Sequence, residues 1–214
     1  MRSARSIWHR CNMKIVLATA MAALLALGES LSQGAVDAPA ESIATRVCAA
    51  CHGSAGDSIS PFFPRLAGQP AAYLERQLKT FRDKTRADPP AVAYMWGMAS
   101  QLDDETIRGL AAYYASRAVR PIPTNPSAAV AFGRDIYEQG IAANRVPACQ
   151  GCHGSAAQGS ATAPRLAGQH PEYLVKQLGF FRARLRGGDP VMVALCAQMT
   201  AEQMQAVALY ASSR

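Results

Sequence analysis

The segment Cys48-Ala49-Ala50-Cys51-His52 sets the organisation of this chain, because Cys149-Gln150-Gly151-Cys152-His153 repeats its pattern. Two cysteines three positions apart lie on one side of a helical turn. Both thiols can there add to the vinyl groups of one porphyrin, and the histidine that follows can reach the iron. The sequence therefore predicts two covalently attached c-type haems. The residues that would attach and ligate them are Cys48, Cys51, His52, Cys149, Cys152 and His153.

A cysteine pair of this spacing also occurs in three other settings. A structural zinc site takes four protein ligands from closely spaced pairs. A redox-active dithiol is typical of a βαβ pattern, which this sequence lacks. A disulfide within the pair is the third alternative. Two copies of the full motif, each inside a longer matching segment, favour haem attachment over these.

A longer internal repeat surrounds the two motifs. Pro64-Arg65-Leu66-Ala67-Gly68-Gln69 recurs as Pro164-Arg165-Leu166-Ala167-Gly168-Gln169. Between the copies, three prolines within residues 120–126 favour an extended, semi-rigid connector. The predicted organisation is a signal peptide at 1–34, a first domain at 35–119, a proline-rich linker at 120–126 and a second domain at 127–214.

The N-terminus has the pattern of a secretory signal. Basic residues precede an apolar run at 15–27, which is shorter than a membrane span requires. An uncleaved anchor is the minority alternative. Export suits haem attachment, which bacteria perform outside the cytoplasm, so we expect a periplasmic location. Part of the formal net charge of +7 belongs to this segment, and no basic stripe interleaved with aromatics indicates nucleic-acid binding.

Helical patterns fill both copies, and strand signals are absent. Leu74, Leu78 and Phe81 share one face of a helix, and the same face recurs 100 residues later. Asp103 is an N-cap type of residue, and Thr200 has capping-box spacing to a glutamine. A further helix is predicted from 127 to 140, with a glycine that allows a second helix to cross closely. These patterns predict an all-α fold.

A methionine in each copy is the candidate for the second axial ligand of the iron. The first copy offers Met95 and Met98. Aligning Tyr113 with Tyr210 pairs Met95 with Met192, whereas Met98 then pairs with a leucine. We therefore predict Met95 and Met192 as the distal ligands, with Met98 as the alternative at the first site.

Two prolines are candidates for orienting the proximal histidines. Pro64 and Pro164 follow their histidines by 12 and 11 residues, and each has a carbonyl oxygen that can accept the other ring N–H. Two residues of the second copy have no counterpart in the first. We expect His170, which matches a proline, to lie on the surface, and Cys196 to be a small buried apolar residue.

On these motifs each copy resembles a class I cytochrome c, and residues 40–214 together resemble the diheme cytochrome c4 family. The resemblance implies an all-α fold of two tandem class I cytochrome c domains, each wrapped around one covalent haem. It also implies electron delivery from a quinol-oxidising cytochrome bc-type complex to a haem-copper terminal oxidase. A loose association with the periplasmic face of the membrane is a further implication. The second copy departs from the pattern in its short loop before Met192 and in Cys196.

Three functions are compatible with two c-type haems. The favoured one is a periplasmic electron carrier, not an enzyme, whose irons change oxidation state without changing ligands. A second is the electron-accepting cytochrome subunit of a dehydrogenase or oxidase complex, which differs only in its partners. A diheme peroxidase is the least favoured, because it needs an iron with an open position and each copy has a methionine to close it.

Overall fold

Helices account for the regular structure of the part of the chain that is described. The computed structural model describes residues 40–187 and 189–214, and within these ranges the β-type pairing is a single bridge between Ile141 and Val146. The all-α prediction is confirmed. The predicted signal peptide at 1–34 and residues 35–39 of the first predicted domain lie outside the described residues. We call residues 40–119 the first half and residues 127–214 the second half.

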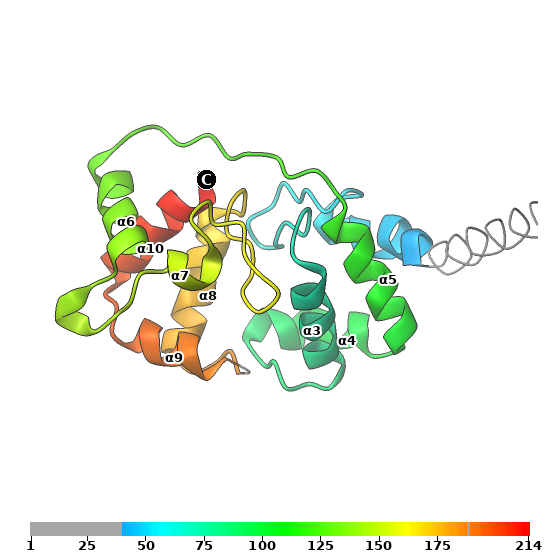
Figure 1. Ribbon diagram of the computed structural model, residues 1–214. Coiled ribbons are helices and arrows are strands. Elements are labelled where there is room, and N and C mark those ends of the chain that lie inside the picture. Colours follow the sequence, from blue (N-terminus) through cyan, green and yellow to red (C-terminus); the bar gives the residue numbers. More distant parts are fainter. Residues whose placement is uncertain (1–39, 188) are drawn as a thin grey trace, which may run out of the picture. The chain divides into compact units, whose positions relative to one another are not determined.

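Each half carries a comparable series of helices (Figure 1). In the first half they are the π-helical turn η1 (Ala44–Cys48), α2 (Ala49–His52), α3 (Ala71–Arg82), the π-helical turn η2 (Ala91–Met95), α4 (Trp96–Ala99) and α5 (Asp104–Ala115). In the second half they are α6 (Ala128–Gln139), the 3-10 turn η3 (Ala142–Asn144), α7 (Gln150–His153), α8 (Pro171–Arg182), α9 (Pro190–Ala197) and α10 (Ala201–Ser212). None of these helices is long and apolar enough to cross a membrane.

Helices α3 and α5 form the core of the first half. Leu74 of α3 packs with Leu110 and Tyr114 of α5, and all three are buried. Phe81, two turns further along the same face of α3, is buried in a second cluster with Ala91 and with Ala99 of α4. The predicted apolar face of this helix is therefore its core face, as the helical spacing of its residues requires.

Side chains cap the starts of both C-terminal helices, as the sequence predicts. The carboxylate of Asp103 accepts a hydrogen bond from the backbone N–H of Thr106 at 2.8 Å, at the start of α5. At the start of α10, Thr200 and Gln203 each accept from the other's backbone N–H, at 3.2 and 2.9 Å. These bonds satisfy backbone donors that a helix leaves without internal partners.

Helices α6 and α10 cross at close range in the second half, and they lie side by side in Figure 1. The contact is at Gly133, where an added β-carbon would collide with the backbone carbonyl of Ala206. Tyr137 of α6 and Met204 and Val207 of α10 complete the buried seam. The predicted close crossing at a glycine is confirmed.

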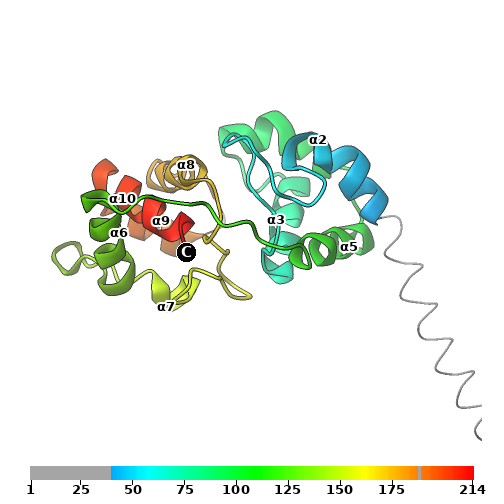
Figure 2. The ribbon, with the colours of Figure 1, turned by 90° about the horizontal axis from the view of Figure 1, so that it is seen from above.

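The segment between the halves has no regular secondary structure from residue 118 to 127. It runs in an extended conformation from α5 to α6 (Figure 2). Its beginning is held in place, because Arg120 pairs with Asp57 at 3.1 Å and its carbonyl oxygen accepts from the Arg65 guanidinium at 3.1 Å. The division into domains at 119 and 127 stays a prediction that rests on the sequence repeat.

Replacing Gly133 with alanine tests the close crossing. The added methyl group must push α10 away, so we expect a loss of roughly 1–3 kcal/mol in the free energy of unfolding, typical of an overpacked core. Denaturant unfolding of the haem-loaded protein measures it. Arg134→Ala, at the next and exposed position of α6, is the matched control and should change stability by less than about 0.5 kcal/mol.

Candidate functional site

The two motif histidines have the same environment. His52 ends α2 and His153 ends α7, and each is only 8% exposed. The Nδ1 atom of His52 lies 2.9 Å from the carbonyl oxygen of Pro64, and that of His153 lies 2.9 Å from the carbonyl oxygen of Pro164. A carbonyl oxygen can only accept, so Nδ1 carries the ring proton in both cases. The lone pair of each neutral ring is therefore on Nε2, where a metal ligand needs it.

Burial also keeps these two rings neutral. It lowers the pKa of His52 and of His153 below the usual value, although the hydrogen bond to each proline carbonyl acts in the opposite direction. A protonated imidazole cannot bind a metal. Both rings are consequently available as ligands at neutral pH.

The motif cysteines are free thiols on single helical turns. Cys48, Cys51 and Cys149 are half-buried and Cys152 is exposed, and none of the five cysteines in the described ranges forms a disulfide. Burial raises the pKa of Cys48, and it raises the pKa of Cys149 to about 11. The described residues contain no cluster of three or more histidine, cysteine or acidic side chains that could hold a metal ion directly.

The candidate distal methionines lie on helices beside the cores of their halves. Met95 ends the π-helical turn η2 and packs against the cluster of Phe81, Ala91 and Ala99. Met192 lies in the first turn of α9, where its backbone N–H donates to the Asp189 carboxylate at 3.0 Å, and its side chain packs against the second core. Met98, the alternative at the first site, is 56% exposed. π-Helical turns are frequent at functional sites.

An aromatic contact joins the histidine segment to the methionine segment in the first half. The ring of Phe63 lies edge-on to His52, with 6.2 Å between centroids, and edge-on to Tyr94, with 5.7 Å. Tyr94 directly precedes Met95. Two thiols on one helical turn, an imidazole with a fixed tautomer and a half-buried methionine next to Tyr94 are the donor types that a c-type haem requires. The residues present therefore fit the group.

A reciprocal set of hydrogen bonds joins the two halves, and we did not predict it from the sequence. The Gln169 side chain accepts from the Arg65 backbone N–H and donates to the Arg65 carbonyl, both at 2.9 Å. The Gln69 side chain makes the same two bonds to the backbone of Arg165, at 3.0 and 2.7 Å. We call these four residues the glutamine clamp. The signal in the sequence was the identity of the two segments that contain them.

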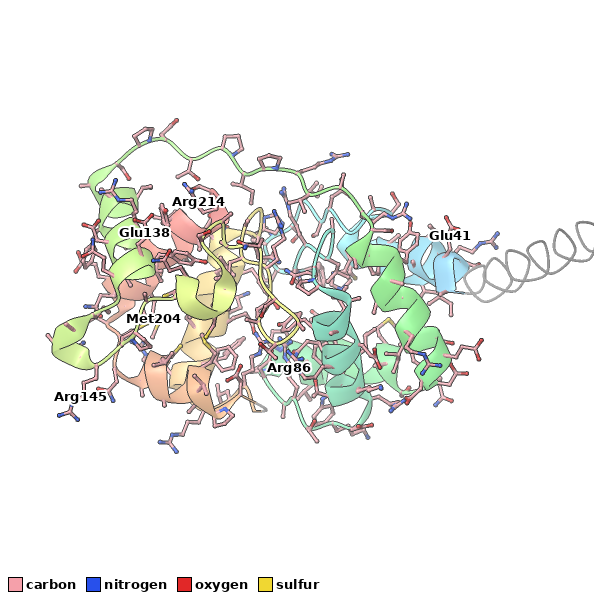
Figure 3. The ribbon with its side chains drawn as sticks, in the orientation of Figure 1. Glu41, Arg86, Glu138, Arg145, Met204 and Arg214 are labelled. Carbon is pink, nitrogen blue, oxygen red and sulfur yellow. The ribbon has the colours of Figure 1, made fainter. Side chains whose placement is uncertain are left out.

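A second shared group lies between α3 and α8. The guanidinium groups of Arg86 and Arg186 both donate to the side-chain oxygens of Gln77 and Gln177. Arg186 also donates to the Tyr73 hydroxyl at 2.9 Å. We call these five residues the arginine cluster; Figure 3 labels Arg86, whose side chain points from the first half toward the second. Each glutamine oxygen accepts from arginines of both halves, so these charge-assisted hydrogen bonds link the two halves.

The expectation that His170 lies on the surface was wrong. His170 is 7% exposed, and its Nε2 lies 2.8 Å from the carbonyl oxygen of Ser58 in the opposite half. Burial lowers the pKa of its ring. The error arose because the contact surface between the halves could not be read from helical periodicity within one of them.

Cys196 is fully buried in the core of the second half, as expected. Burial raises the pKa of its thiol to about 12.

A family model and several individual proteins match this chain. The family model for cytochrome c matches residues 38–117. The chain is 40% identical to cytochrome c-552 of Acidithiobacillus ferridurans, over 90% of this chain and 84% of that protein. It is 37% identical to cytochrome c4 of Pseudomonas aeruginosa, over 87% of this chain and 94% of that protein. It is also 36% identical to the thiosulfate dehydrogenase electron acceptor of Thiomonas intermedia, over 78% of each.

Solved structures agree with these relatives. The crystal structure of reduced recombinant cytochrome c4 from Pseudomonas stutzeri superposes with a TM-score of 0.73 at 34% sequence identity. The match covers 82% of this chain and 97% of that one. An Acidithiobacillus ferrooxidans cytochrome c4 structure gives a TM-score of 0.70 at 38% identity and covers 98% of that chain.

Thiol titration tests the placement of the cysteines. When the four motif thiols are consumed by thioether bonds, Cys196 is the one thiol left within residues 35–214. Burial raises the pKa of this thiol to about 12, so almost none of it is thiolate at pH 8, and burial also blocks access to the reagent. We expect no reaction with a thiol reagent in the folded protein and one reactive thiol per chain after denaturation. A thiol that reacts rapidly in the folded protein contradicts this placement.

Proposed function

The chain belongs to the cytochrome c4 family, a family of diheme electron-transfer cytochromes. We therefore propose that it carries single electrons from a quinol-oxidising cytochrome bc-type complex to a haem-copper terminal oxidase. Two covalently attached c-type haems are its cofactors. The observation that carries the proposal is the bond from each motif histidine to a proline carbonyl, which is 2.9 Å long in both halves. Two equivalent, permanently ligated sites suit an electron carrier.

In this proposal the chain's residues hold and tune the two haems. Cys48 and Cys51 attach the first, and Cys149 and Cys152 attach the second. His52 and His153 would bind the irons, with Pro64 and Pro164 fixing their orientation, and Met95 and Met192 would supply the second protein ligands. Each haem supplies an iron that gains or loses one electron. The methionine sulfur atoms would favour ferrous iron and raise the reduction potential of each haem, which suits electron transfer.

The proposed methionine ligands argue against peroxide chemistry. Both Met95 and Met192 are half-buried against the cores of their halves rather than displayed to solvent. An iron that bound both a methionine and a histidine of this chain would have no open position for a substrate. We therefore propose an electron carrier and not a diheme peroxidase.

A second candidate is an electron-accepting subunit of a dehydrogenase or oxidase complex. The similarity to a protein named thiosulfate dehydrogenase electron acceptor favours it. Its residues would perform the same chemistry, and only the electron donor would differ.

We place this function in the periplasm. The signal pattern at 1–34 supports export, and covalent haem attachment in bacteria takes place there. A loose, peripheral contact with the membrane would bring the protein to membrane-embedded partners, and redox proteins are its expected partners.

Rapid mixing with isolated complexes tests the partners. The reduced bc-type complex should reduce both haems, and the terminal oxidase should reoxidise them, with rates that exceed the turnover of the respiratory chain. A bc-complex inhibitor should abolish the first step. Haems that are reduced by a purified dehydrogenase but not by the bc-type complex would support the second candidate instead.

Substituting the distal methionines tests the ligand set. Met95→Ala and Met192→Ala should each lower the reduction potential of one haem, because a thioether that favours ferrous iron is lost. Each should also open one iron to carbon monoxide and remove half of the weak red band of the ferric protein. Met98→Ala is the control and should leave potentials and band unchanged. Loss of half the band in Met98→Ala, with none in Met95→Ala, would reverse the assignment at the first site.

A further inference from the structure

The peptide group between Pro64 and Arg65 takes part in two hydrogen bonds at once. Its carbonyl oxygen accepts from Nδ1 of His52 at 2.9 Å, and its N–H donates to Oε1 of Gln169 at 2.9 Å. His52 and the peptide belong to the first half, whereas Gln169 belongs to the second. A side chain of one half is thus separated from the proximal histidine of the other by a single amide group.

The same arrangement occurs with the halves exchanged. The peptide group between Pro164 and Arg165 accepts from Nδ1 of His153 at 2.9 Å and donates to Oε1 of Gln69 at 3.0 Å. Gln69 and Gln169 are 6% and 4% exposed, so these bonds are largely shielded from bulk solvent. Each glutamine also donates to the next carbonyl, of Arg165 or Arg65, which holds its amide in a fixed orientation.

A hydrogen bond at the N–H of an amide changes the strength of the hydrogen bond at its carbonyl oxygen. The peptide bond is a resonance hybrid, so an acceptor that draws on its N–H increases the negative charge on its carbonyl oxygen. Chains of hydrogen bonds strengthen one another in this way, and the effect is larger in a buried site of low dielectric. A stronger acceptor at Nδ1–H makes the imidazole a more basic ligand at Nε2.

We propose that Gln69 and Gln169 are positioning residues that set the basicity of the proximal histidine in the opposite half. Gln169 acts on His52 through the Pro64–Arg65 amide, and Gln69 acts on His153 through the Pro164–Arg165 amide. The reduction potential of each haem thereby depends on contact with the other half. This inference rests on the proposed role of His52 and His153 as iron ligands.

Two single substitutions test this crossed arrangement. Gln169→Leu removes the acceptor from the Arg65 N–H, weakens the bond at His52 and makes that ligand less basic. The haem of the first half should then become easier to reduce. Gln69→Leu should do the same to the haem of the second half. A twofold to threefold change in the electron-exchange equilibrium between the haems corresponds to about 20–30 mV, at 59 mV per tenfold change for one electron.

The readouts are the potential of each haem, resolved by NMR during a redox titration, and the Nδ1–H resonance of each proximal histidine in the reduced protein. Gln169→Leu should move the His52 resonance upfield and leave that of His153 in place. Gln169→Glu keeps an acceptor for the Arg65 N–H and should hold the His52 resonance downfield of its position in Gln169→Leu. A purely structural role for Gln169 would not distinguish these two variants.

His170→Leu is the matched control. It removes a different bond between the halves, from His170 to Ser58, without changing the charge of a ring that burial keeps neutral. It should leave both proximal resonances unchanged.

The crossing of the effects decides the outcome. The inference is overturned if each glutamine substitution shifts the reduction potential of the haem in its own half. It is also overturned if the shifts are equal for both haems and no larger than those in His170→Leu. The spectra of the parent protein distinguish a failure of this inference from a failure of the proposed ligand set. Parent spectra without signals from two ligated histidines overturn the ligand set, whereas intact signals that stay in place in both leucine variants overturn the inference alone.

Discussion

The hydrogen bond from Nδ1 of each motif histidine to a proline carbonyl is the interaction on which the rest of the site depends. It fixes the ring tautomer and leaves the lone pair on Nε2, on the side of the ring away from that carbonyl. Proline has no N–H, so its own nitrogen makes no competing bond at this position. The residue after each proline then meets a glutamine from the other half. One six-residue segment, present twice, therefore serves both the iron ligand and the contact between the halves.

Local features of the fold could be predicted from the sequence because their causes are local. The cap at Asp103, the capping box at Thr200 and the apolar face of α3 each depend on residues within two turns of a helix. The crossing at Gly133 was also predictable, since a glycine at a core-facing helix position indicates a close neighbour. The bonds to the proline carbonyls followed from the donor and acceptor groups that each residue possesses. The domain limits and the ligand roles of the methionines remain predictions.

The contact between the halves could not be predicted in the same way. Gln69, Gln169 and His170 are polar, and polar residues usually lie at the surface of a single domain. They are buried here because a second domain covers them and supplies partners for their donors and acceptors. Polar residues that are kept at equivalent places in both copies, such as Gln77 and Gln177 of the arginine cluster, were a usable signal. They indicate a surface that meets its own counterpart.

The glutamine clamp has the symmetry of a homodimer within a single chain. In a contact related by a twofold axis, residue i of one partner meets residue j of the other, and j meets i. Gln69 meets Arg165 as Gln169 meets Arg65. In separate chains such a pair would dissociate on dilution, whereas the connector makes the encounter intramolecular, at a fixed effective concentration. The two haem sites therefore keep their stoichiometry at any protein concentration. Because the partners are no longer copies of one sequence, a substitution such as His170 for the proline of the first half can alter one side of the pair and leave the other as it was.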